Sequence, residues 1–282
     1  MNATADSEFS VGSYTVVDGV RLHYRESGQG EPVLLLHGWP TSSLLWRHVV
    51  PEISSRRRVL ALDLPGFGFS DKPLDRSYSF RFYARMIEGF LENLGIERTA
   101  LVVHDLGGPV GLYWAVNNAN RISRLAILNT LVYPEMSWAV KAFVLMLKLP
   151  FVRTWTVSPA GLRFAMQIGV LRSERRTPEM YEAVLAPFVT GDAREALIKA
   201  GSELSPKGFF LIAQRLKALQ MPVCIVYGKR DRILPDIART ASRLQSDLPQ
   251  AEVTALEDCG HFLQEDAPEE LARELKRFLA GQ

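Results

Sequence analysis

The stretch Leu101-Val102-Val103-His104-Asp105-Leu106-Gly107-Gly108 decides the fold of this chain. A short apolar run ends in a charged residue and then turns, through small residues, into the helix-like apolar segment Val110 to Val116. This pattern is typical of a strand that bends tightly into a helix and exposes one side chain at the bend. The residue at the bend is Asp105, and a carboxylate there predicts attack on carbon with formation of an alkyl–enzyme ester. The alternative interpretation is that Asp105 only caps the following helix.

Strand and helix patterns alternate on both sides of this stretch. The dipeptide Asp18-Gly19 predicts a hairpin turn between two β-rich runs near the start of the chain. Apolar runs predict buried strands at 33–36, 59–62 and 125–128. An amphipathic segment at 79–94, followed by Gly95, predicts a helix. The alternation predicts a mostly parallel, twisted α/β sheet flanked by helices, with ligands at the carboxyl ends of the strands.

The alternation stops between Tyr133 and Leu216 and resumes at Val223. Residues 133–216 carry helical patterns broken by several prolines. We therefore expect a core in two parts, 1–132 and 217–282, with residues 133–216 inserted as a helical cap.

Composition predicts a soluble globular protein. Of 282 residues, 47% are hydrophobic and 23% charged, and the formal net charge of +2 favours neither a nucleic-acid nor a membrane partner. Cys224 and Cys259 resemble free thiols of a reducing compartment, and residues 1–10 lack the apolar core of a signal peptide. We expect a cytoplasmic monomer or homodimer without metal or cofactor.

An alkyl–enzyme ester needs a base that activates water and an acid that orients the base. His261 follows the last predicted strand, and Asp231 follows the strand before it, so the chain order is nucleophile, acid, base. Asn129 occupies the alternative acid position but cannot supply a charge. The backbone N–H groups of Trp39 and Leu106 are the expected donors for the oxyanion that forms on the ester.

These motifs together resemble the aspartate-nucleophile branch of the α/β-hydrolases, which includes the epoxide hydrolases and haloalkane dehalogenases. The motifs that carry the resemblance are His37-Gly38-Trp39-Pro40, the loop 63–70, the Asp105 stretch, Asp231 and Gly260-His261-Phe262. The resemblance implies an α/β-hydrolase fold with an inserted helical cap. It also implies a catalytic triad of Asp105, Asp231 and His261 that acts on a small apolar substrate with water.

Within this branch, different motifs of the chain indicate different substrates. Haloalkane dehalogenases carry a Trp after the nucleophile and often an Asn in the His-Gly-X-Pro turn, where this chain has Leu106 and Trp39. An aromatic residue in that turn is typical of epoxide hydrolases, whose cap tyrosines protonate the opening ring. Tyr133 and Tyr181 are the candidates for this acid. We therefore predict an epoxide hydrolase that converts apolar epoxides to diols.

Three other functions stay open. A haloalkane dehalogenase would need indole N–H donors near Asp105, and the candidates are Trp39, Trp138 and Trp155. The run Leu128-Asn129-Thr130 resembles the β-lactone decarboxylases. A receptor-like protein of this fold would bind a ligand without turnover.

Overall fold

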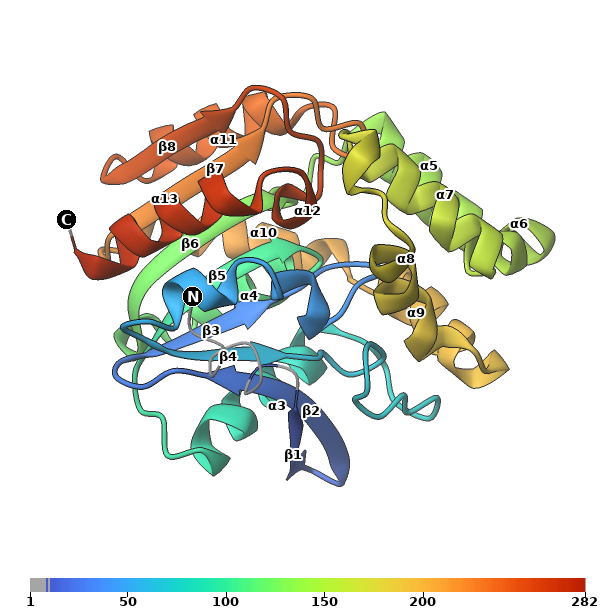
Figure 1. Cartoon of the computed structure of the whole chain (residues 1–282), viewed down its shortest axis with the longest axis horizontal. Helices are drawn as coiled ribbons and strands as arrows, with labels where there is room; N and C mark the ends of the chain where they lie inside the picture. The colour runs from blue at the N-terminus through green and yellow to red at the C-terminus, as the bar shows by residue number, and fades with distance from the viewer. Residues whose placement is uncertain (1–8, 10, 282) are drawn as a thin grey trace.

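The computed structural model describes residue 9 and residues 11–281. Within these residues eight strands form one sheet in the order β1-β2-β4-β3-β5-β6-β7-β8 (Figure 1). The strands are β1 (Gly12–Val17), β2 (Val20–Ser27), β3 (Pro32–Leu36), β4 (Arg58–Leu62), β5 (Thr99–Asp105), β6 (Ile122–Thr130), β7 (Val223–Gly228) and β8 (Ala251–Leu256). β1 and β2 pair antiparallel, β2 also pairs antiparallel with β4, and all pairs from β4 to β8 are parallel. The predicted mostly parallel sheet is confirmed.

The local signals in the sequence produce the expected local structure. Asp18 and Gly19 have φ angles of 50° and 80°, as a type I′ hairpin turn requires. The predicted helix at 79–94 is α3 (Phe80–Asn93), and the Ser79 side chain accepts a hydrogen bond from the backbone N–H of Phe82. Gly95 follows it with a φ of 67°, a conformation that favours glycine.

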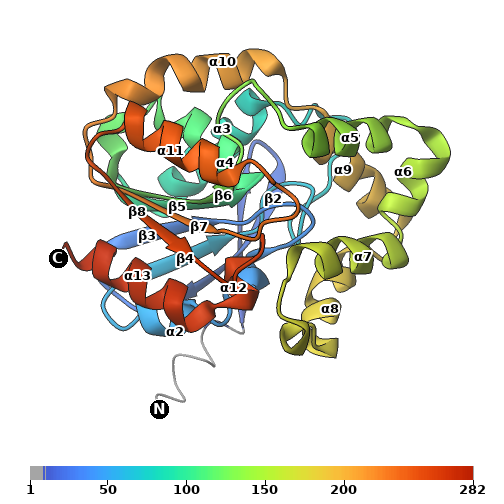
Figure 2. The same cartoon turned by 90° about the horizontal axis from the view of Figure 1, so that it is seen from above.

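Helices cover both faces of the sheet, which is why the central strand β3 is apolar throughout. One face carries α3, α4 (Gly107–Ala115), α10 (Pro206–Arg215) and α11 (Ile237–Asp247), and the other carries α2 (Val50–Ile53), α12 (Leu263–Asp266) and α13 (Pro268–Ala280) (Figure 2). The short 3-10 turns are η1 (Ser43–Trp46), η2 (Ala119–Arg121), η3 (Ser173–Arg175), η4 (Ala186–Phe188) and η5 (Leu216–Ala218). Residues Val33 to Leu36 of β3 have no exposed surface, because they are buried between the two helix layers.

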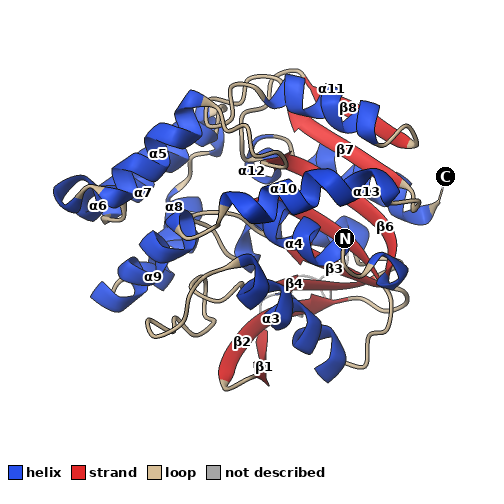
Figure 3. Ribbon diagram, turned by 180° about the vertical axis from the view of Figure 1, so that it is seen from behind, coloured by secondary structure: helices blue, strands red, loops and turns tan. Residues whose placement is uncertain are grey.

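A group of helices between β6 and β7 extends from one end of the sheet (Figure 3). These are α5 (Trp138–Lys148), α6 (Pro150–Thr156), α7 (Pro159–Gly169), α8 (Pro178–Leu185) and α9 (Gly191–Ser202). In contrast, α10 packs on the core, since the rings of Phe209 and Phe80 meet with centroids 5.2 Å apart. We propose that α5 to α9 form the cap and that it ends before α10, whereas the sequence pattern placed its end at residue 216.

Candidate active site

Asp105 lies at the bend between β5 and α4. Its φ of 48° is in the left-handed region, which non-glycine residues rarely adopt outside tightly constrained turns. The side-chain hydroxyl of Thr130 donates a 2.6 Å hydrogen bond to the Asp105 carbonyl and helps to hold the bend. Gly38 packs so closely on Asp105 that a Cβ there would overlap the carboxylate. The Asp105 side chain is 17% exposed, so an incoming small molecule can reach it.

The structure brings Asp105, His261 and Asp231 together from three separate parts of the chain. His261 Nε2 lies 3.2 Å from Asp105 Oδ2, and His261 Nδ1 lies 2.8 Å from Asp231 Oδ2. The other oxygen of Asp231 accepts hydrogen bonds of 2.8 Å from the backbone N–H groups of both Ile233 and Leu234. The imidazole is therefore held in one orientation, with its Nε2 edge toward Asp105.

The charges of these three groups stabilise one another. Burial opposes ionisation of Asp105, but the hydrogen bond and the positive charge of His261 outweigh it and lower the pKa of Asp105. Burial also opposes the charged form of Asp231, and His261 lowers the pKa of this carboxyl in turn. Burial disfavours protonation of His261, but Asp231 and Asp105 outweigh it and raise the pKa of His261 to about 10. At neutral pH a protonated imidazole therefore lies between two carboxylates.

Two backbone amides point at the Asp105 carboxylate. The N–H of Trp39 donates a 2.7 Å hydrogen bond to Oδ1, and the backbone N–H of Leu106 helps to lower the pKa of this carboxyl. These are the two donors that the sequence predicts for the oxyanion. Because both are main-chain groups fixed by the strand ends, they can stabilise charge on this oxygen without reorganisation.

Asn129 has a role that sequence reasoning missed. Its amide N–H₂ donates to Asp231 Oδ2 at 2.6 Å, and its oxygen accepts the backbone N–H of Gly228 at 3.0 Å. As expected, the Asn129 amide carries no charge. It instead holds the charged carboxylate of Asp231 in place through this hydrogen bond. Its position at the end of β6, at the same sheet edge as Asp105, is the signal that could have identified it.

The segment that carries His261 is also bound to the cap. The carbonyl of Gly169, the last residue of α7, accepts a 2.8 Å hydrogen bond from the backbone N–H of His261. The buried carboxylate of Asp266 accepts from the backbone N–H groups of Gly260 (2.7 Å), Leu171 (3.0 Å) and Arg172 (2.9 Å). One side chain therefore joins the segment after α7 to the residue before His261.

Replacing Asp266 with asparagine is expected to lower kcat about tenfold or more with little change in KM, because a small displacement of His261 impairs the reaction more than binding. The amide N–H₂ would face N–H groups that need an acceptor, so the free energy of unfolding should fall by about 2 kcal/mol. The matched control is Glu265→Gln, which disrupts the ion pair of the neighbouring residue with Arg47 (2.7 Å) but keeps the hydrogen bonds that Asp266 accepts. Urea denaturation and steady-state kinetics on both variants test this. Equal kinetic effects in the two variants would show that Asp266 is merely structural.

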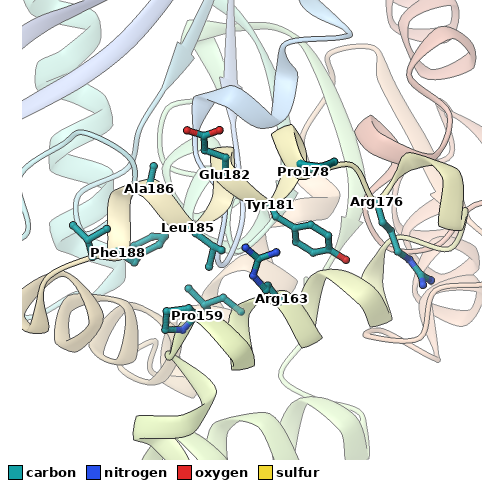
Figure 4. A pocket seen from close by; sticks show the side chains of 11 residues that line it. Pro159, Arg163, Arg176, Pro178, Tyr181, Glu182, Leu185, Ala186 and Phe188 are labelled. Carbon is teal, nitrogen blue, oxygen red and sulfur yellow. The ribbon is translucent and has the colours of Figure 1, made fainter.

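The two candidate tyrosines lie in different surroundings. The Tyr133 hydroxyl donates a 2.9 Å hydrogen bond to Asp247 at the end of α11, and the Arg243 guanidinium lies 3.7 Å from its ring centroid. Its hydroxyl is therefore engaged away from Asp105. Tyr181 lines a cavity of about 750 Å³ between α7 and α8, and the Arg163 guanidinium lies 4.9 Å from its ring centroid (Figure 4). Asp105 is not among the residues that line this cavity.

The candidate indoles do not converge on Asp105. The side-chain N–H of Trp39 donates to the carbonyl of Leu197 in α9 at 3.1 Å, so it connects the site to the cap. Trp138 is 76% exposed and Trp155 is 48% exposed, both on the outer surface of the cap. None of these three side chains donates a hydrogen bond to Asp105 within the residues that the structure describes.

Comparison with known proteins identifies the family. A family described as the alpha/beta hydrolase fold matches residues 31–268, which is most of the chain. The chain belongs to this family. The predicted fold class is thereby confirmed together with the observed sheet, and the aspartate at the bend fits the branch to which the sequence was assigned.

The similar proteins have different activities. A cis-3-alkyl-4-alkyloxetan-2-one decarboxylase from Shewanella oneidensis is 30% identical, with 93% of this chain and 86% of the relative covered. A soluble epoxide hydrolase from a Corynebacterium species is 27% identical, with 94% and 96% covered. The solved structure of a haloalkane dehalogenase from Bradyrhizobium elkani superimposes with a TM-score of 0.86 at 26% identity, with 96% of this chain and 98% of that chain covered. These relatives support an α/β-hydrolase enzyme and leave its substrate open.

Proposed function

We propose that this enzyme forms an ester between Asp105 and a saturated carbon of an apolar substrate and then hydrolyses it. Oδ2 of Asp105 attacks the carbon, and the bond from that carbon to its leaving group breaks with the electron pair on the leaving group. Water then attacks the carboxyl carbon of the ester and gives its proton to His261, which Asp231 orients. The amides of Trp39 and Leu106 hold the resulting oxyanion. The bond between the carboxyl carbon and the substrate oxygen then breaks, His261 returns the proton to that oxygen, and Asp105 is regenerated as the alcohol product leaves.

We further propose that the substrate is a β-lactone, on the observation that neither Tyr133 nor the Trp39 indole is free to assist another leaving group. An epoxide oxygen leaves as an alkoxide and needs a proton donor, and a halide needs N–H donors around it. Cleaving a β-lactone between its ring oxygen and saturated carbon releases a carboxylate, which needs no proton at neutral pH. The oxetan-2-one in the name of the Shewanella oneidensis relative is such a lactone.

The predicted epoxide hydrolase becomes the second candidate, and Tyr181 is the observation that favours it. Its side chain lines the cap cavity, and its hydroxyl makes no hydrogen bond within the described residues. A cap movement that carried this hydroxyl to Asp105 would supply the proton that an epoxide needs.

The test is the intact mass of the His261→Gln variant after exposure to a β-lactone, a terminal epoxide and a bromoalkane, each with an alkyl chain. Without the base the first step survives and hydrolysis does not, so the ester should accumulate. We expect an adduct equal in mass to the whole lactone, mapped to the peptide that contains Asp105 and absent from the His261→Gln, Asp105→Ala double variant.

The other adducts have distinct meanings. An adduct equal to a whole epoxide would favour the second candidate, and one equal to an alkyl group without bromine would identify a dehalogenase. A lactone adduct that persists in the double variant would reflect acylation of another side chain and would contradict the proposal. In wild-type enzyme, a single turnover in heavy-oxygen water should leave the label in Asp105 and not in the first product.

A further inference from the structure

The outer surface of the cap exposes large apolar side chains. These include Leu145 (56% exposed) on α5, Leu149 (45%) between α5 and α6, Phe151 (92%) and Trp155 (48%) on α6, and Phe164 (50%) on α7. We call these five residues the apolar cap face. Isolated exposed apolar residues are ordinary, but a group of this size marks an interaction site.

The apolar cap face is continuous across the three helices. Leu145 lies two turns after Trp138 and therefore on the same side of α5, and Leu149 directly follows the end of that helix. The rings of Trp155 on α6 and Phe164 on α7 are in contact, with centroids 5.7 Å apart. Figures 1 and 2 show α5, α6 and α7 side by side at the end of the molecule farthest from β8 and α13.

The charged residues of α5, α6 and α7 are all basic. Residues 136–173 contain no Asp or Glu and five basic residues, which are Lys141, Lys148, Arg153, Arg163 and Arg172. Because the whole chain has a formal charge of only +2, the remainder of it is net negative. Lys141 and Lys148 are exposed, and within the described residues neither they nor Arg153 form an ion pair.

We propose that the apolar cap face docks on the surface of a bilayer that contains anionic phospholipids. Exposed Trp, Phe and Leu side chains next to Lys and Arg are the combination that inserts at the headgroup boundary while the cations bind lipid phosphates. A second copy of the chain is the less suitable occupant, because pairing this face with itself would bring two sets of positive charges together. The described residues contain no helix with the length and hydropathy of a membrane span.

This inference stands independently of the proposed function, because binding is measured without turnover. It also has a consequence for the site, since the last residue of α7 accepts the hydrogen bond from the His261 backbone. A membrane contact at α7 would therefore reach the active site through one helix. An apolar substrate dissolved in the bilayer would be presented to the cap directly.

The experiment is flotation of the full-length protein with vesicles of phosphatidylcholine alone and of phosphatidylcholine mixed with phosphatidylglycerol. We expect binding to the anionic vesicles only, and weaker binding as salt is added. The double variant Phe151→Ser, Trp155→Ser should reduce the partition coefficient at least about tenfold. Replacing Lys148 and Arg153 with glutamine should reduce it about fivefold per charge.

Matched controls lie on α10, away from the cap. Phe210 is 62% exposed, so Phe210→Ser removes a comparable apolar side chain, and Lys207→Gln removes an exposed charge. Both controls should bind like wild type, and circular dichroism checks that all variants fold. Absence of vesicle binding, equal binding to both kinds of vesicle, or equal losses in the controls would overturn the proposal. A particle mass in free solution that falls to the monomer only in the Phe151→Ser, Trp155→Ser variant would assign the face to a second copy instead.

Discussion

Replacing Asp105 with asparagine should lower kcat/KM by a factor on the order of 10⁴ or more. The amide has almost the same shape as the carboxylate, and its oxygen can still accept the 2.7 Å hydrogen bond from the Trp39 amide. It is nevertheless a very poor nucleophile toward carbon, so the ester does not form. The effect should appear as a loss of kcat with substrate binding largely retained, because the substitution leaves the other side chains of the site unchanged.

The measurement combines steady-state kinetics with ligand binding on the same preparation. Asp236→Asn is the matched control, since it is the same substitution at an acidic residue whose ion pair is with the exposed Arg239 (3.2 Å). That control should retain wild-type kinetics. An Asp105→Asn enzyme that keeps more than about a hundredth of the wild-type kcat would mean that Asp105 is not the nucleophile.

Much of the fold could be predicted because its signals are local. The Asp18-Gly19 turn, the Ser79 cap and the apolar run of β3 each depend on a few neighbouring residues. The same holds for Asp105, since a strand that ends in a small-residue turn can only expose the side chain at the bend. For this reason the expected positions of Trp39 and Leu106 around its carboxylate also followed from sequence.

The remaining parts of the site depend on contacts between distant positions. Asn129 acts on Asp231, 102 residues away, and Asp266 binds Leu171 and Arg172 across about as many. Tyr133 illustrates the opposite error, because its sequence position suggested a cap acid while the fold directs its hydroxyl to Asp247. No periodicity or motif encodes such pairings. They appear only when the strand ends are brought to one edge.

The overall composition does not reveal a local excess of basic residues in the cap. A net charge of +2 predicted no anionic partner, yet residues 136–173 contain only basic charged residues. Averaging over 282 residues cancels this local excess against the acidic remainder. The distribution of charge over the folded surface, and not its sum, leads to the proposed membrane contact.

The charge state of His261 links the two proposed steps of the reaction. In the free enzyme the carboxylates of Asp105 and Asp231 together keep the imidazole protonated, since its pKa is about 10. A protonated imidazole cannot activate water. Once Asp105 becomes an ester it loses its negative charge, and only Asp231 remains to stabilise the imidazolium. The pKa of His261 then falls and its proton passes to solvent water, so the neutral base becomes available only after the ester that it must hydrolyse has formed.

The same charge state predicts how stability depends on pH. In the unfolded chain His261 loses its proton near pH 6.5, whereas in the folded chain it keeps the proton up to about pH 10. A pKa raised by folding contributes stability that is full below about pH 6.5 and is lost as the pH rises through about 10. The contribution lost over this window should be on the order of 4 kcal/mol. Wild type should therefore lose more stability between these pH values than His261→Gln, because tyrosines and cysteines titrate alike in both proteins.

Urea denaturation of wild type and His261→Gln at several pH values between about 6 and 10 measures this difference directly. His48→Gln serves as the control, because burial lowers the pKa of His48 and its loss should leave the alkaline slope unchanged. Parallel curves for wild type and His261→Gln would mean that the imidazole is neutral in the folded enzyme. In that case His261 could act as a base before Asp105 is alkylated. Ester formation would then not be needed to remove the positive charge from the imidazole.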